Sequence, residues 1–296
     1  MSVSPIVARL LLAARQAYDV TQTGPAPADP AYAAIGWSAT PAAVVGGDDG
    51  IGAALIGVTA TEAIVAFRGT LPPNANSPDK RQVLLDWLKD FDALLVPGPN
   101  LPGLVHQGFL DQFEPIWNDV LALIPLGLPL YFTGHSKGGA LANLAAARWA
   151  TLNPAATAPI VVTFAAAKPG DGAFEAVYDT IVPHSLRYEY QDDIVPHLPP
   201  GVAFYDVFKA VPTISDTLVN LPSARMTGTA GYVSVGDLQF IDWTNTIVPD
   251  SVLLRLDRYA HLVELLLSLG FEHIIADHSI DDGAGYAGAI LPAAAV

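Results

Sequence analysis

A glycine-bracketed serine is the feature that most constrains how this chain can fold. The sequence GHSKGG, Gly134–Gly139, follows the apolar run Leu128–Thr133 and precedes an alanine-rich stretch that extends to about Leu152. The apolar run is too short for a helix of ordinary length and predicts a buried strand. The alanine-rich stretch has high helix propensity. Strand, glycine turn and helix in this order predict a sharp turn that lifts the serine side chain clear of a sheet.

Ser136 has the surroundings that a nucleophilic serine requires. Gly134 and Gly138 lack a Cβ, so the strand and the helix can approach closely enough for the turn to form. The following helix directs its N-terminal dipole at the serine, and the backbone N–H of Lys137 can face a developing oxyanion. Short glycine turns are common, but the flanking strand and helix favour a catalytic serine. For His135 we expect a packing role, because the neighbour of a nucleophile on such a turn points elsewhere.

Strands and helices alternate on both sides of the serine. Upstream, two β-like runs over 51–58 and 62–67 are joined by a short turn and predict a hairpin at a sheet edge. Downstream, a strand over 160–166, a short helix from about Gly172 and a strand over 185–190 predict a mostly parallel sheet covered by helices. The fold class is therefore α/β.

The remaining segments are assigned from composition and periodicity. The N-terminal segment predicts an amphipathic helix rather than a signal peptide, because no basic residue precedes the apolar run and Arg9 and Arg15 interrupt it. The other expected features are a Pro/Ala/Gly-rich connection over 24–47, helices over 107–124 and 251–269, a strand pair around 229–235 and 238–241, and a Gly/Ala-rich loop from Asp277.

Length and composition favour one soluble domain. A chain of 296 residues is long, but α/β folds of this size form around a single sheet, so we expect one domain over residues 1–296. Hydrophobic residues make up 51% and charged residues 15%, which is typical of a chain with a large core. No stretch reaches the roughly 18 consecutive apolar residues of a membrane span. We expect a soluble protein, with its compartment undetermined.

Charge and cysteine content exclude several classes of function. Asp and Glu outnumber Lys and Arg 29 to 14, giving a formal charge of −15, so nucleic acid would be repelled. The chain has no cysteine, which rules out disulfides, thiolate metal sites and a cysteine nucleophile.

Seven short stretches, in order, make the chain resemble the class 3 lipase family, the fungal-type triacylglycerol lipases and their bacterial and plant relatives. Each stretch is weakly specific alone, but together they extend over most of the chain. The resemblance implies an α/β-hydrolase fold and cleavage of carboxylic esters with no cofactor and no metal. The stretches are FRGT (67–70), DWLKDFD (86–92), VHQGF (105–109), TGHSKGGALA (133–142), TFAAAKPGD (163–171), DIVPHLPP (193–200) and DHSIDDGAGY (277–286).

The resemblance also implies an oxyanion donor and an acid. The residue after Arg-Gly, here Thr70, would offer the second oxyanion donor beside the N–H of Lys137. The acid would be Asp193, which follows the strand that ends near Tyr190. A buried carboxylate there would fix the histidine tautomer and stabilise the imidazolium. Asp192 is the alternative acid.

Four histidines remain as candidates for the base once the order of the residues along the chain is considered. The order of serine, acid and histidine in this fold excludes His106 and His184. His278 lies in the stretch that resembles the family's histidine segment, and we favour it as the base. The other candidates are His273, which ranks second, His197 and His261.

Two departures from the family and one helix bear on substrate choice. Lys137 replaces the apolar residue that usually follows the serine, and Lys168 stands close to where relatives have a basic Arg. Apolar residues over 83–95 recur at helical spacing and predict an amphipathic helix. It lies where the family's lid lies, so we expect a lid at about 71–104, although a permanently packed helix would give the same pattern.

Together these features predict a serine hydrolase that cleaves acylglycerol or related lipid esters through an acyl-enzyme on Ser136. The expected partner is a lipid or other ester substrate, met at a lipid–water interface. The same residues would serve a short-chain esterase, a phospholipase, a feruloyl-type esterase, or acyl transfer to an alcohol. The alternative from another class is a non-catalytic protein that binds a lipid or a partner protein.

Overall fold

The computed structural model describes residues 3–25, 30–47, 50–70, 94–200, 231–268, 270–281 and 283–294. Within these ranges an eight-stranded sheet has the order β1-β2-β3-β6-β7-β9-β11-β12. The neighbours from β3 to β11 are parallel, and the pairs at both ends are antiparallel. The strands are β1 Ala42–Gly46, β2 Gly52–Val58, β3 Ala63–Phe67, β6 Leu130–His135, β7 Ile160–Phe164, β9 His184–Tyr190, β11 Asp237–Ile241 and β12 Ile247–Val248.

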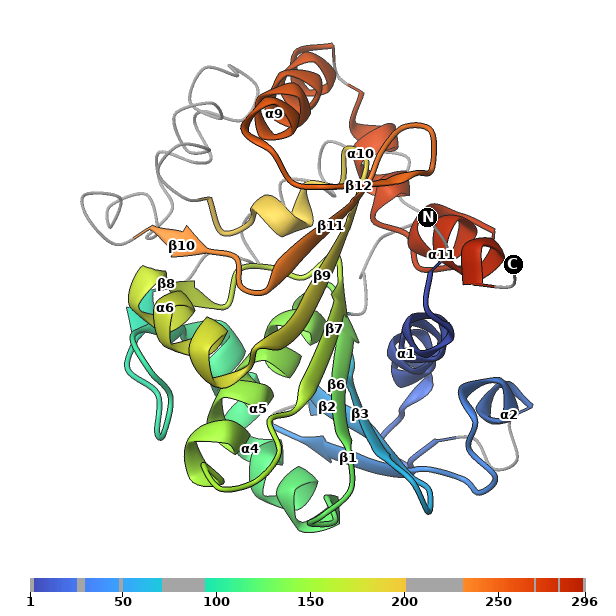
Figure 1. Cartoon of the computed structure of the whole chain (residues 1–296), viewed down its shortest axis with the longest axis vertical. Coiled ribbons are helices and arrows are strands. Elements are labelled where there is room, and N and C mark those ends of the chain that lie inside the picture. The colour runs from blue at the N-terminus through green and yellow to red at the C-terminus, as the bar shows by residue number, and fades with distance from the viewer. Residues whose placement is uncertain are drawn as a thin grey trace.

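Helices cover both faces of this sheet (Figure 1). Alternate residues of β3 point to opposite faces, so Val65 and Phe67 join one hydrophobic core while Ile64 and Ala66 join the other. Helices α4 and α5 pack on the first core, and α1 and α11 pack on the second. The helices are α1 Pro5–Gln16, α2 Ala31–Ile35, α4 Gln107–Leu123, α5 Lys137–Leu152, α6 Gly172–Ile181, α9 Val252–Leu267, α10 Phe271–Asp277 and α11 Gly285–Ala294, with short 3-10 turns at Ala17–Asp19 and Val195–His197.

The predicted α/β class with a mostly parallel sheet and helices on both faces is confirmed, as are the strand, turn and helix around Ser136. The hairpin at 51–67 is also present, but it does not form the sheet edge. Strand β1, within the connection predicted from its Pro and Gly content, pairs outside β2. Glycine is required there because a Cβ on Gly46 or Gly52 would lie 2.8 Å from Ile116 or 2.4 Å from the Gln112 carbonyl oxygen on α4.

Two further expectations near the C-terminus are wrong. The strand pair predicted around 229–241 does not form, because β10 (Tyr232–Val233) pairs with β8 (Gly170–Asp171) and β11 pairs with β9. With β5 (Val105–His106) and β4 (Leu95–Val96), β10 and β8 form a second, four-stranded sheet. The tail from Asp277 includes a helix, α11, which buries Tyr286, Ala287 and Ile290.

The predicted lid over about 71–104 falls largely outside the described residues. Residues 71–93 lie outside them, whereas Leu95, the predicted end of the amphipathic helix, belongs to strand β4. None of the helices within the described ranges is long and apolar enough to cross a membrane.

Candidate active site

Ser136 lies on a strained turn between β6 and α5. Its backbone has φ 60° and ψ −131°, outside the regions that non-glycine residues ordinarily adopt. The two flanking glycines make this turn sterically feasible. A Cβ on Gly134 would lie 2.2 Å from the Gly138 carbonyl oxygen, and one on Gly138 would lie 2.2 Å from the Phe67 carbonyl oxygen. Strain of this kind persists only where the surrounding structure enforces it, and it is typical of functional sites.

His278 and Asp193, 85 positions apart in the sequence, are hydrogen-bonded to each other. Nδ1 of His278 lies 3.0 Å and 3.1 Å from the two carboxylate oxygens of Asp193. Asp193 follows the end of β9, and His278 caps the C-terminus of α10. Because a carboxylate only accepts, the Nδ1 of His278 carries the hydrogen and Nε2 is left as the basic nitrogen. The structure therefore brings together the predicted acid and the predicted base.

Asp193 is held by further hydrogen bonds. It is 1% exposed and accepts from the backbone N–H of Val195 at 2.9 Å. The hydroxyl of Tyr286 donates to its Oδ2 at 2.8 Å and accepts from the backbone N–H of Tyr190 at 3.0 Å. Burial, followed by the neighbouring Asp193 carboxylate, raises the pKa of Tyr286 well above its usual value, so the hydroxyl stays protonated and can donate. A buried carboxylate with several donors keeps a fixed orientation.

His135 contacts the backbone of the candidate base, His278. Its Nε2 lies 2.9 Å from the backbone carbonyl oxygen of His278, and its Nδ1 lies 2.8 Å from the hydroxyl of Tyr18. Burial, together with the nearby His278, lowers the pKa of His135 well below its usual value. The ring is therefore neutral, donates through Nε2 to the carbonyl, and accepts through Nδ1 from Tyr18. Its role extends beyond packing to anchoring the backbone of His278.

Sequence reasoning missed the contributions of Tyr18 and Tyr286. Tyr18 is 117 positions from its partner His135, and Tyr286 is 93 positions from Asp193. No local pattern encodes contacts of such separation. The available signal was that Tyr286 ends the stretch resembling the family's histidine segment.

The two predicted oxyanion donors lie on neighbouring elements. Thr70 follows β3, which pairs in parallel with β6, the strand that leads to Ser136. Gly69 allows this approach, because a Cβ there would lie 2.0 Å from the Tyr18 hydroxyl and 2.8 Å from the His135 carbonyl oxygen. Lys137 is the first residue of α5 and is 4% exposed. The assignment of the two N–H groups as oxyanion donors stays a prediction.

The alternative acid and bases have other environments. Asp192 accepts a hydrogen bond from Nε1 of Trp243 at 2.8 Å. His261 stacks on that same indole ring, with centroids 4.0 Å apart. His273 lies within α10, and His197 lies in the 3-10 turn after Asp193. In the described ranges no group of three or more His, Asp or Glu side chains could hold a metal ion.

In sequence, the chain is similar to known lipases. The sequence model of the family described as Lipase (class 3) matches residues 64–203. A lipase of Caenorhabditis elegans is 35% identical over 135 residues, which cover 44% of this chain and 37% of that protein. A lipase of Rhizomucor miehei is 30% identical over 174 residues, covering 55% of this chain and 45% of that protein. The chain thus spans less than half the length of either relative.

Solved structures of fungal lipases have the same fold. The triacylglyceride lipase of Rhizomucor miehei is similar with a TM-score of 0.56 and 21% identity, over 80% of this chain and 78% of that chain. A lipase of Yarrowia lipolytica is similar with a TM-score of 0.56 and 19% identity, over 82% and 81%. The fold is the α/β-hydrolase fold of these enzymes. The matched family model, the sequence relatives and this fold make the chain similar to the class 3 lipase family.

Proposed function

We propose that the protein is a serine hydrolase of carboxylic esters, a lipase that cleaves acylglycerol or related lipid esters through an acyl-enzyme on Ser136. The observation that carries the proposal is the hydrogen bond between His278 Nδ1 and the buried Asp193 carboxylate, at the same end of the sheet as the strained serine. The match to the class 3 lipase model and the names of the relatives support the ester class.

The proposed reaction proceeds in two acyl-transfer steps. Oγ of Ser136 attacks the ester carbonyl carbon while Nε2 of His278 takes the hydroxyl proton, and Asp193 stabilises the imidazolium that forms. The N–H groups of Thr70 and Lys137 stabilise the oxyanion. The intermediate collapses, and the alcohol leaves with the proton from His278. Water then attacks the acyl-enzyme with His278 again as base, which releases the carboxylic acid and restores Ser136.

The substrate class and its presentation form the second part of the proposal. The preferred substrate is a medium- or long-chain acyl ester, met at a lipid–water interface, and the whole chain acts as one hydrolase domain. A lid at 71–104 that turns its apolar face to lipid would make turnover depend on that interface. The alternative functions, which are a short-chain esterase, a phospholipase, a feruloyl-type esterase, acyl transfer to an alcohol and a non-catalytic binder, differ from a lipase in how turnover depends on the interface or in the product that forms.

A series of nitrophenyl esters from short to long acyl chains tests the proposal. Rates should be measured below and above the aggregation point of each substrate, with Ser136→Ala as the inactive variant. Ser268→Ala, at the exposed C-terminal end of α9, is the matched control and should keep wild-type rates. We expect Ser136→Ala to lower kcat by about 10³-fold or more.

The outcomes separate the alternatives. A rise in rate where a long-chain substrate aggregates supports the lipase, and a smooth curve peaking at short chains replaces it with an esterase. Product esters formed in the presence of an acceptor alcohol would indicate acyl transfer. If the wild type and Ser136→Ala both lack turnover, the protein is a non-catalytic binder and the proposal fails.

A further inference from the structure

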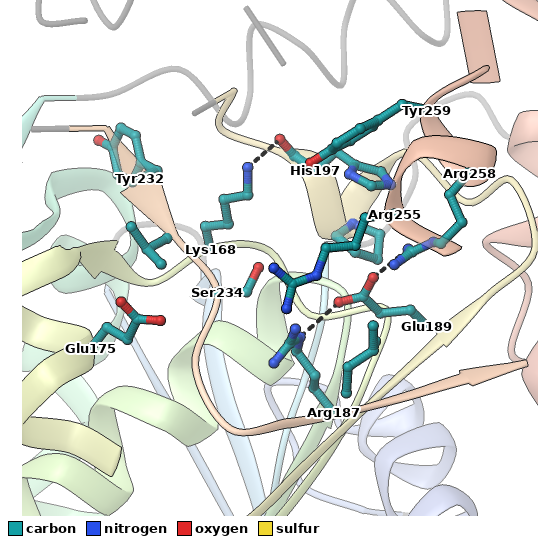
Figure 2. A pocket seen from close by; sticks show the side chains of 13 residues that line it. Lys168, Glu175, Arg187, Glu189, His197, Tyr232, Ser234, Arg255, Arg258 and Tyr259 are labelled. Atoms are coloured by element: carbon teal, nitrogen blue, oxygen red, sulfur yellow. Dashed lines mark hydrogen bonds and ion pairs between the residues drawn. The ribbon is translucent and has the colours of Figure 1, made fainter. Parts of the chain in front are cut away.

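A polar cavity lies on the opposite side of β9 from the Tyr286 contacts. Its volume is about 310 Å³, at the lower end of the range of pockets that hold small molecules. Residues from β9, β10, α6, α9 and the turn after Asp193 line it (Figure 2). Most of the lining side chains are charged or polar, which suits a compact polar group better than an acyl chain.

Cations gather around this cavity although the protein is strongly acidic. Lys168, Arg187, Arg255 and Arg258 line it, which is four of the 14 Lys and Arg residues in a chain with a formal charge of −15. Two carboxylates, Glu175 and Glu189, also line it. The described lining therefore has two more positive than negative charges.

Glu189 is occupied by two of these cations. The residue is 4% exposed, and its carboxylate accepts from Nε of Arg187 at 2.9 Å and from a terminal nitrogen of Arg258. Burial alone would raise the pKa of Glu189, but the guanidinium groups of Arg258 and Arg187 outweigh it and lower the pKa to about 2. A third cation, Arg255, pairs with the carboxylate of Asp250. Each of these three arginines is thus paired with a carboxylate. Lys168 differs from them, because among the described residues it forms no ion pair.

The ammonium of Lys168 is buried beside a neutral partner. The residue is 9% exposed, and its Nζ donates to the backbone carbonyl oxygen of His197 at 3.0 Å. Among the described residues no carboxylate forms an ion pair with it. Burial lowers the pKa of Lys168 to about 8, partly offset by the charge of Glu189, so the group is still mostly protonated at pH 7. A buried cation without a counter-ion is costly unless a ligand supplies one.

The donors that line this cavity suit an anion as that ligand. Figure 2 shows the Lys168 ammonium and the Arg255 guanidinium between Glu175 on one side and Glu189 on the other. Nε of Arg258 is also buried without a hydrogen-bond partner. Ammonium, guanidinium and the Ser234 hydroxyl are donors that suit the several oxygens of a phosphate group.

We propose that this cavity is a binding site for a phosphate-bearing group, with Lys168 as its principal cation. The group is either free phosphate or the phosphoryl headgroup of a lipid, since both present the same oxygens. The site is connected to the candidate active site through the backbone, because the N–H of Lys168 donates to the carbonyl oxygen of Leu198 at 2.8 Å, five residues after Asp193. The proposal goes beyond ester hydrolysis and does not depend on it.

Isothermal titration of the full chain with inorganic phosphate and with glycerol 3-phosphate tests the site. We expect binding by the wild type and a loss of at least about tenfold in affinity in Lys168→Gln, because a hydrogen bond to a charged group is removed. Lys168→Arg keeps the charge and should retain binding. The matched control is Arg15→Gln, which removes one positive charge from α1 on the other face of the sheet. Thermal unfolding shows that each variant is folded.

A second measurement distinguishes the two sources of phosphate. Sedimentation with vesicles of phosphatidylcholine alone or with added phosphatidic acid is made in the Ser136→Ala background, so that no lipid is hydrolysed. Stronger binding to phosphatidic acid that is lost in Lys168→Gln identifies a lipid headgroup, whereas binding of soluble phosphates alone identifies a free anion. Equal titrations for the wild type and folded Lys168→Gln, or no binding of any phosphate by the wild type, would overturn the proposal. None of these readouts requires Ser136 to be catalytic.

Discussion

The two faces of strand β9 differ in how they hold polar groups. On one face, which we call the aromatic face, Tyr188 packs on Phe164 and Tyr190 packs on Tyr286. The hydroxyl of Tyr286 donates a hydrogen bond to Asp193. On the other face, which we call the charged face, Arg187 and Glu189 form an ion pair that lines the cavity. Successive side chains of a strand point to opposite sides, so one heptapeptide separates two environments.

The contrast shows two ways to fix a buried group. Asp193 and His278 are oriented by uncharged groups: the Tyr286 hydroxyl donates to Asp193, and the neutral His135 ring, itself held by the Tyr18 hydroxyl, donates to the backbone of His278. These donors set geometry without adding net charge, as preorganised catalysis requires. The cavity instead balances charge against charge and has cations in excess, as a binding site for an anion requires. Under the two proposals made above, the first face serves ester hydrolysis and the second face binds an anion.

The largest expected effect is on the aromatic face. Asp193→Asn should lower kcat for esters by roughly 10³- to 10⁴-fold with little change in KM, because the histidine loses its charged orienter. Asp192→Asn is the matched control, since its carboxylate bonds Trp243 instead, and its kcat should fall far less. Steady-state kinetics of the two variants with the same ester measures the loss of kcat in each. A greater loss in Asp192→Asn would exchange the roles of the two residues.

On the charged face, Glu189→Gln should affect stability. It leaves the buried guanidinium of Arg258 without its carboxylate and should cost about 3–5 kcal/mol in the free energy of unfolding. Because folding lowers the pKa of Glu189 from 4.5 to about 2, its contribution is present above pH 4.5 and disappears as the pH falls through 2. Urea unfolding at pH 7 and pH 3 measures both effects. The exposed Glu272→Gln is the control, and an equal midpoint in both variants would contradict the account.

A smaller effect is expected for Tyr286→Phe. The change removes one hydrogen bond to Asp193 and one from the Tyr190 N–H, so we expect about 1–3 kcal/mol lower stability and a kcat lowered roughly tenfold. Tyr178→Phe is matched in chemistry, since that buried hydroxyl bonds Asn143 and Ser185. It should lose similar stability and keep its kcat. Equal kcat values in the two variants would remove Tyr286 from the positioning of the acid.

The smallest effect concerns Asp277, beside the candidate base. Burial raises the pKa of its carboxyl to about 7, and the charges of Asp193 and Asp192 add to the rise although the N–H of Asp192 opposes it. Because the pKa of Asp277 rises from 3.8 in the unfolded chain to about 7 in the folded protein, the folded state binds its proton more tightly. The resulting stabilisation is fully present below pH 3.8 and is lost as the pH rises through 7. Asp277→Asn should therefore flatten the fall in stability between pH 5 and pH 8. Identical pH profiles for the variant and the wild type would contradict this, with exposed Asp119→Asn as the control.

The predictable part of the fold was encoded in local patterns. The apolar run before Ser136 and the alanine-rich stretch after it become β6 and α5, because burial and helix propensity agree there. The wrong predictions arise where local signals are ambiguous. Gly46 and Gly52 look like strand breakers but serve close packing on α4, and α11 is apolar on nearly every side, which leaves no helical periodicity to detect.

The site was predictable to the extent that it follows from motifs. Ser136, Asp193 and His278 each lie in a stretch resembling the family, and the structure brings the acid and the base into contact. The supporting contacts could not be predicted, because Tyr18 and His135 meet only after the first helix packs across the sheet. The excess of cations around Lys168 is likewise a tertiary property, since its members come from three separate segments.

Covalent labelling with a fluorophosphonate, mapped by peptide mass spectrometry, tests the central claim most directly. The account predicts a single adduct on Ser136 in the wild type, no adduct in Ser136→Ala, and labelling slowed by about 10³-fold in His278→Gln because the general base is missing. Labelling of a different residue, or of Ser136 at the same rate in His278→Gln, would contradict it.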